Sequence, residues 1–288
     1  MFTETTLLFK TILILSGQIG IVFGIAYFLI KRAKYAFENN TKLFGYSFRA
    51  AMNMNKELDL VPFMEPPSKY PIDMTKTIKK NHVEQVDTKK ADDREQVLEL
   101  LRDGYAYKQK DSLYFITIFW FITLFGTLFL STSDLSLFAG LSLFTFQSIA
   151  FGILLGFIIL MMDENDGIKA LKIVLLVTML TGYIGYSDFY SFSENIGLQF
   201  FLLLSLLGLI ILSFIRTAIS FSRKATRWQA IFGAVIFSIY LLVDFNYIKK
   251  QEGIMGMNNW QTAFDMAFTL YLDMINLLLE ILDAMGNS

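Results

Sequence analysis

The segments FSIYLLVDFN at residues 237–246 and LYLDMINL at residues 270–277 decide how this chain folds and where its site lies. Each segment places one acid, Asp244 or Asp273, inside a largely apolar run. A charged side chain at bilayer depth costs at least ~2.5 kcal/mol on insertion scales, so such acids are candidates for a functional site. Two acids in consecutive runs indicate a shared role.

The polar turn at residues 253–259 predicts that the two runs form an antiparallel helical hairpin. Measured from this turn at 1.5 Å per residue, Asp244 lies about 13 Å along one helix and Asp273 about 20 Å along the other. Packed helices can absorb this mismatch of about one turn, so we expect the carboxylates to meet. Asn276 and Glu280 follow Asp273 at i+3 and i+7, which predicts a polar face that borders a cavity.

Two carboxyl groups at hydrogen-bonding distance in a low-dielectric site cannot both ionise cheaply, so they hold one proton between them and titrate as a pair. We therefore predict that Asp244 and Asp273 form a proton-sensitive latch or an ion site, with Asn246, Asn276 and Glu280 as supporting polar residues. The alternative is structural: Asp244 reaches water near the end of its helix or orients the turn, and Asp273 bonds a neighbouring helix.

The composition is typical of a polytopic membrane protein. Of the 288 residues, 54% are hydrophobic, the mean hydropathy is +0.48, and several apolar runs are long enough to span a bilayer. The net charge of -1 and the absence of a basic block argue against a nucleic-acid partner. The chain has no cysteine, and its one histidine, His82, has no second imidazole nearby, so we expect no metal site, no resident cofactor and no enzymatic activity.

The apolar runs predict an all-α fold with seven membrane-spanning helices. They lie at residues 8–30, 112–131, 136–161, 168–188, 196–216, 228–249 and 260–283. The chain then divides into a first anchor helix at 1–31, a polar extramembrane insert at 32–111, and a six-helix membrane domain at 112–288 that carries both aspartates. We expect a multi-pass protein whose main partner is the lipid bilayer, in a bacterial plasma membrane or a mitochondrial or other organelle inner membrane.

Two glycine pairs mark expected helix contacts. Gly20 with Gly24 and Gly152 with Gly156 have the spacing that lets helix backbones approach closely within lipid. We expect each pair to face another helix.

The insert at residues 32–111 is the one large polar segment, and all four prolines of the chain lie at residues 62–71. This proline-rich piece predicts an extended linker. An amphipathic helix is expected after it, with capping-box spacing at Asp92 and Glu95 and with Gly104 placed to end it. Its predicted apolar stripe consists of Val97, Leu98 and Leu101. The insert is interpreted either as a solvated tether or as a docking element for a membrane complex.

The last two predicted helices resemble those of the Bax inhibitor-1 family, also called the transmembrane Bax inhibitor motif family. The resemblance rests on FSIYLLVD at residues 237–244 and LYLDMINL at residues 270–277, and it covers residues 231–282. It implies a seven-helix membrane protein that leaks Ca²⁺ in a pH-dependent manner. It also implies that Asp244 and Asp273 are the pH sensor.

The sequence departs from that family in two respects. Bacterial members place a basic residue of the second helix on the aspartate pair, but residues 112–131 and 136–161 contain no Lys or Arg, and Arg216 is the substitute considered. The long polar insert is also untypical. We expect a pH-sensitive cation (Ca²⁺) leak channel or exchanger. The alternative is a non-conducting structural membrane subunit that has inherited this fold and binds a larger complex through residues 32–111.

Overall fold

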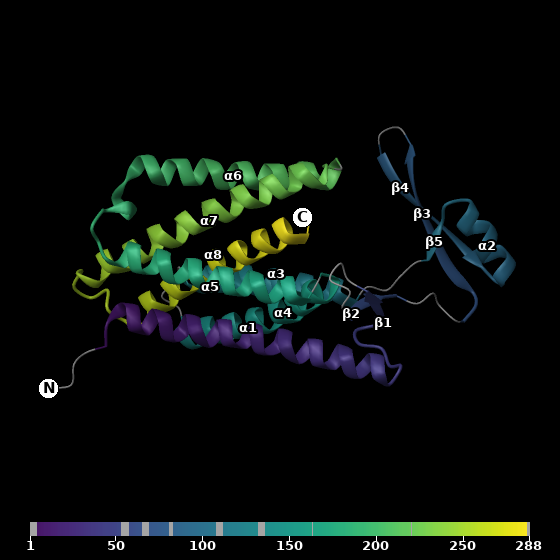
Figure 1. Cartoon of the computed structure of the whole chain (residues 1–288), viewed down its shortest axis with the longest axis horizontal. Helices are drawn as coiled ribbons and strands as arrows, with labels where there is room; N and C mark the ends of the chain where they lie inside the picture. Colours follow the sequence, from purple (N-terminus) through teal and green to yellow (C-terminus); the bar gives the residue numbers. More distant parts are fainter. Residues whose placement is uncertain are drawn as a thin grey trace. The chain divides into compact units, whose positions relative to one another are not determined.

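A computed structural model describes residues 5–52, 58–64, 69–80, 83–107, 112–131, 136–162, 164–219 and 221–286 (Figure 1). These residues divide into two compact units. A helical unit consists of the described residues up to Ile30 and from Thr117 onward, and a second unit consists of Lys31–Ile116. Each unit has a hydrophobic core of its own.

Within the described residues, seven long helices and one 3-10 turn contribute to the helical unit. They are α1 (Leu7–Glu38), α3 (Ser112–Ser131), α4 (Leu137–Met161), α5 (Glu164–Tyr186), η1 (Phe192–Glu194), α6 (Ile196–Ala218), α7 (Arg223–Glu252) and α8 (Trp260–Gly286). Six of them, α1 and α3 to α7, are long and apolar enough to cross a membrane. The seventh, α8, coincides with the last predicted span and buries most of its apolar residues inside the unit. The helical fold class predicted from the sequence is confirmed.

The core of the helical unit forms around α8, which packs against α4, α5 and α7 (Figure 1). Phe144 of α4 is completely buried there. Its ring lies edge-to-face with three rings of α8, at centroid distances of 6.1 Å to Phe264, 5.3 Å to Phe268 and 4.8 Å to Tyr271. Such aromatic contacts stabilise a core beyond the area they bury, and they fix the face of α8 that turns toward α4.

One glycine pair brings α4 close to α1. A Cβ atom built on Gly152 would lie only 2.8 Å from the backbone oxygen of Val22, and Gly156 faces the same helix. The prediction of a helix contact is therefore confirmed for Gly152 and Gly156. It is wrong for Gly20 and Gly24, because no described atom lies within 4 Å of a Cβ built on either residue.

The second unit contains strands that the sequence analysis did not predict. An antiparallel hairpin is formed by β1 (Ser47–Met52) and β2 (Leu58–Phe63). A three-stranded antiparallel sheet has β3 (Ile72–Lys80) between β4 (Val83–Ala91) and β5 (Ala106–Tyr107). Pro62 lies within β2, so the expectation of a linker is wrong there, while Pro66 and Pro67 lie outside the described residues.

The helix α2 (Arg94–Arg102) packs against β3 and β4. Its buried residues are Val97 and Leu100, whereas Leu98 and Leu101 are exposed, so the predicted stripe was correct only at Val97. The core of the unit consists of Ile72, Met74, Ala91, Val97, Leu100 and Tyr105.

The ends of α2 follow the local sequence, with one shift. The capping residue is Asp93 rather than Asp92, because its Oδ1 accepts a hydrogen bond from the Gln96 backbone N–H at 2.8 Å. The Gln96 side chain reciprocates and accepts from the Asp92 N–H at 2.8 Å, so the box uses Gln96 and not Glu95. Gly104 follows the helix with a positive φ of 84°, as predicted.

Candidate ion and proton site

The packing of α7 on α8 brings Asp244 and Asp273 together. Asp273 is 8% exposed, and its carboxyl group lies in hydrogen-bonding contact with that of Asp244. The Oδ2 atoms of both residues are shielded from solvent, and no donor from any other described residue reaches either atom. The side chains therefore meet as the hairpin spacing predicts.

This contact has a consequence for protonation. Two adjacent carboxylates in a low-dielectric site repel each other, so they retain one proton between them. While that proton is present, one carboxyl group donates a hydrogen bond to the other and links α7 to α8. When it leaves, the link becomes a repulsion between like charges. The protonation state of the pair thus decides whether the two carboxyl groups attract or repel each other across the α7–α8 contact.

No described Lys or Arg forms an ion pair with either aspartate. Arg216, the basic partner considered from the sequence, instead binds Asp283, with Nη1 2.5 Å from Oδ2 and Nη2 3.1 Å from Oδ1. Asp283 follows Asp273 by 10 residues, which is ~15 Å along a helix. The interpretation of Arg216 as a latch on the aspartate pair is therefore wrong.

Asn276 and Glu280 line a groove between α6, α7 and α8 with a volume of about 470 Å³. The cavity predicted beside this polar face is therefore present. The Glu280 carboxylate lies directly over Gly233 of α7, where an added Cβ would be 2.5 Å from the carboxyl carbon. Asn276 stands between Asp273 and Glu280 along α8, so the polar face runs from the aspartate pair into this groove.

Asn246, the third supporting residue, serves a different part of the fold. It is completely buried, and its Oδ1 accepts hydrogen bonds from the backbone N–H and the hydroxyl of Ser193 at 3.0 and 2.9 Å. Its Nδ2 donates to Gly185 O, Asp188 Oδ1 and Tyr190 O. These partners lie in the last turn of α5 and in the connection between α5 and α6. Asn246 therefore fixes that connection and does not extend the polar face of α8.

Two charged residues that the sequence analysis did not single out secure the same end of the helical unit. Lys10 of α1 is 6% exposed, and its Nζ donates to the backbone oxygen and Oδ1 of Asn258 at 2.9 and 3.0 Å. Asp188 accepts from Lys250 at 3.1 Å, and this hydrogen bond lowers the pKa of the Asp188 carboxyl. The role of Lys10 could have been suspected from the sequence, because this basic residue lies within the first apolar run.

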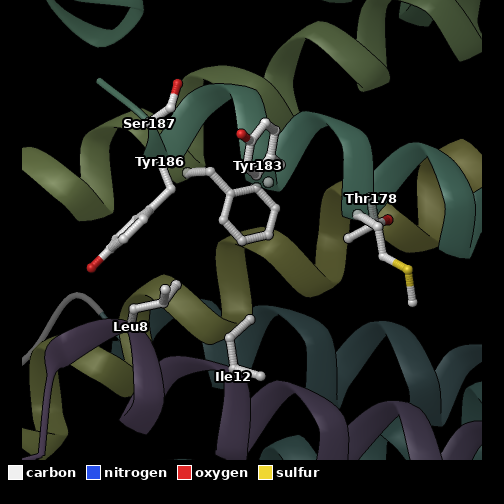
Figure 2. A pocket seen from close by; sticks show the side chains of 9 residues that line it. Leu8, Ile12, Thr178, Tyr183, Tyr186 and Ser187 are labelled. Carbon is white, nitrogen blue, oxygen red and sulfur yellow. The ribbon is translucent and has the colours of Figure 1, made fainter. Parts of the chain in front are cut away.

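A second cavity lies between α1, α5 and α7 and contains neither aspartate (Figure 2). Its volume is about 410 Å³. Figure 2 shows Leu8 and Ile12 of α1 facing Thr178, Tyr183 and Tyr186 of α5. This cavity is a space between helices and is separate from the polar face of α8.

Within the described part of the chain, no group of three or more His, Asp or Glu side chains is placed to hold a metal ion. The expectation of no metal site stays a prediction. His82 lies outside the described residues.

Long apolar helices together with a buried contact between two acids define a multi-pass integral membrane protein. Residues 100–288 match the family model described as inhibitor of apoptosis-promoting Bax1, of the Bax inhibitor-1 family. This match covers more than half of the chain, and the chain belongs to this family. It extends well beyond residues 231–282, on which the resemblance rested. No curated protein matches the chain.

Proposed function

We propose that this protein is a pH-sensitive leak channel or exchanger for cations, with Ca²⁺ as the transported ion, gated by the proton that Asp244 and Asp273 share. The observation that carries the proposal is the contact between the two carboxyl groups in a shielded position, with no basic partner among the described residues. Membership of the Bax inhibitor-1 family supports it.

The gate operates through the charge of the pair. With one proton bound, the two side chains hold α7 against α8. Without it, two negative charges require a counter-charge, and no described Lys or Arg supplies one. A divalent cation fits this need, because carboxylate oxygens are the ligands that Ca²⁺ prefers. Proton release therefore both weakens the helix contact and creates an affinity for the transported ion.

The polar face of α8 provides a route for the ion away from the aspartate pair. Asn276 and Glu280 continue from Asp273 toward the end of α8, where Asp283 binds Arg216. A cation that leaves the aspartate pair on this side finds oxygen ligands at each step.

Ca²⁺ efflux from liposomes containing only the purified chain tests this proposal. The rate should change between about pH 6 and 8, because loss of the shared proton leaves two adjacent buried charges. Asp244→Asn and Asp273→Asn put a permanently neutral group in the pair, so each variant should lose the pH response whatever its absolute rate. Asp166→Asn, an acid-to-amide change at an exposed ion pair of α5, serves as the matched control and should keep the response.

The same liposomes separate a channel from an exchanger. Proton movement that accompanies Ca²⁺ efflux in a fixed ratio identifies an exchanger, whereas efflux without it identifies a channel. If the wild type carries no cation at any pH in this range, the transport proposal fails. If it does but both Asn variants keep the full pH response, the aspartate gate alone fails.

The second candidate function is a non-conducting subunit of a membrane complex. The observation that favours it is the second unit, Lys31–Ile116, which has its own core and lies mostly outside the family match. For this function, the wild type should be silent in liposomes. In native gels of the host membrane, it should migrate in a larger complex that disappears when residues 41–108 are replaced by a Gly/Ser linker.

A further inference from the structure

Polar contacts hold both ends of α6 against the other helices. Immediately before its start, Ser193 binds Asn246 of α7 at 2.9 Å. In its last turns, Arg216 binds Asp283 of α8 through two hydrogen bonds. Between these two ends, α6, α7 and α8 leave the groove of about 470 Å³ that contains Glu280.

The groove has an apolar wall and one charged group. Its apolar residues are Leu206, Leu209, Ile210, Phe214, Phe237 and Leu279. Its polar residues are Ser213, Asn276 and Glu280, and of these only Glu280 is ionisable. A volume of this size lies within the range of small-molecule sites, which are mostly apolar with a few placed polar groups.

The charge of Glu280 is not balanced by its neighbours. Within the described chain no Lys or Arg forms an ion pair with Glu280, and the nearby Arg216 is bound by both oxygens of Asp283. Glu280, when ionised, therefore has no ion-pair partner among the described Lys and Arg residues. The carboxylate is seated there because Gly233 offers no side chain to displace it. A charge beside an apolar wall is unfavourable unless a partner compensates it.

We propose that this groove binds a hydrophobic organic cation with a single positive charge. The cationic group lies at the Glu280 carboxylate and the Asn276 side chain, and the apolar body lies against α6 and Phe237. The rings of Phe214 and Phe237 add favourable contacts to a cation. The ligand both covers the apolar wall and balances the one unpaired charge.

Other occupants satisfy only part of this site. A lipid acyl chain would cover the wall but leave the carboxylate without a partner. A Ca²⁺ ion requires six to eight oxygen ligands, and this groove offers one carboxylate. An anion would meet a negative charge. This groove shares Asn276 and Glu280 with the proposed ion route, but Glu280 follows Asp273 by 7 residues, ~10 Å along α8. Ligand binding at Glu280 can therefore be measured without any ion flux through the aspartate pair.

Binding of tetraphenylphosphonium to the full chain in nanodiscs tests this proposal. Empty nanodiscs give the part of the signal that is due to lipid. Tetraphenylborate has the same shape and the opposite charge, and it serves as the matched ligand control. The wild type should bind the phosphonium saturably above the empty-disc level and should not bind the borate.

Two variants and one control locate the site. Glu280→Gln keeps the shape and removes the charge, so the phosphonium affinity should fall at least about tenfold, the factor that 1.4 kcal/mol produces. Ile210 is 45% exposed, so Ile210→Trp is tolerated by the fold and should abolish binding by filling the groove. Asp265→Asn is also an acid-to-amide change on α8, but Asp265 lies outside the groove, so this variant should leave the phosphonium affinity unchanged.

The outcomes decide the proposal without reference to ion flux. Saturable binding that Glu280→Gln and Ile210→Trp reduce and Asp265→Asn does not reduce supports it. Wild-type binding at the empty-disc level, equal binding of the borate, or unchanged affinity in both groove variants overturns it. Each variant is first shown to elute as a folded monodisperse species, so that loss of binding reports on the groove.

Discussion

Asn246 is completely buried, and its side chain takes part in five hydrogen bonds with the last turn of α5 and the connection between α5 and α6. Asn246→Ala removes all five and leaves the Ser193 N–H and the Gly185 carbonyl without this partner. Each unsatisfied buried group costs about 1–3 kcal/mol, so the thermal midpoint in detergent should fall by several degrees. Asn39→Ala, at an exposed position, should not lower it. An unchanged midpoint in Asn246→Ala would contradict the structural role.

Lys250 and Asp188 give a pH-dependent contribution to stability at the same end of the helices. The Lys250 hydrogen bond lowers the pKa of Asp188 in the folded state. The contribution is therefore complete above the unfolded value of about 3.9 and is lost as the pH falls through the folded pKa. Lys250→Met should be less stable than the wild type at pH 7, and the difference should shrink below about pH 4. Thermal unfolding across this range measures it; a constant difference would exclude the mechanism.

Site residues could be recognised in the sequence where a charged side chain interrupts an apolar run, because such a charge is costly within a membrane. Asp244 and Asp273 stand out because they interrupt apolar runs, and helical rise alone places them at similar depth. The partner of Arg216 and the burial of Lys10 depend on how distant helices pack. Asp283 and Asn258 are 67 and 248 residues away from them, and no local pattern encodes such pairings.

At the scale of helices, two glycines test the close approach of α1 and α4: Gly152 lies at the contact, and Gly20 faces open space. Gly152→Ala places a methyl group 2.8 Å from the Val22 backbone oxygen, which forces the helices apart and should cost about 1–3 kcal/mol. Gly20→Ala meets open space in the described structure. It should be neutral or stabilise by up to about 1 kcal/mol, because alanine favours a helix over glycine. Thermal midpoints in detergent compare the two, and equal effects would contradict the contact.

The strands were missed although one of them carries a readable pattern. In β3, Ile72 and Met74 are buried while Asp73 and Thr75 are less so, and this alternation is typical of a strand. The prolines just before it and the lysines along it favoured a linker. The polar side of the groove at Glu280 was predicted, but its apolar wall was not. The residues of α6 that form this wall, such as Leu206, Ile210 and Phe214, lie far from Glu280 in the sequence.

At the scale of the whole molecule, the two units have separate cores, and both aspartates lie in the helical unit. We therefore expect residues 41–108 to be replaceable by a Gly/Ser linker of ~20 residues, which spans ~25 Å on average. The shortened protein should elute as a folded species with a thermal midpoint near that of the wild type. Its Ca²⁺ efflux should retain the pH response of the full chain. Loss of the folded species would show that the helical unit requires the insert.

The contact between Lys10 and Asn258 has a consequence for biosynthesis. Lys10 leaves the ribosome before its partner, which follows 248 positions later. At 5–20 residues per second, this buried amine waits roughly 10–50 s for its acceptor. The first helix therefore cannot reach its final position until the last hairpin is made. In ribosome-arrested chains that end before residue 258, Lys10 should react with an amine-modifying reagent, and in the finished protein it should be protected.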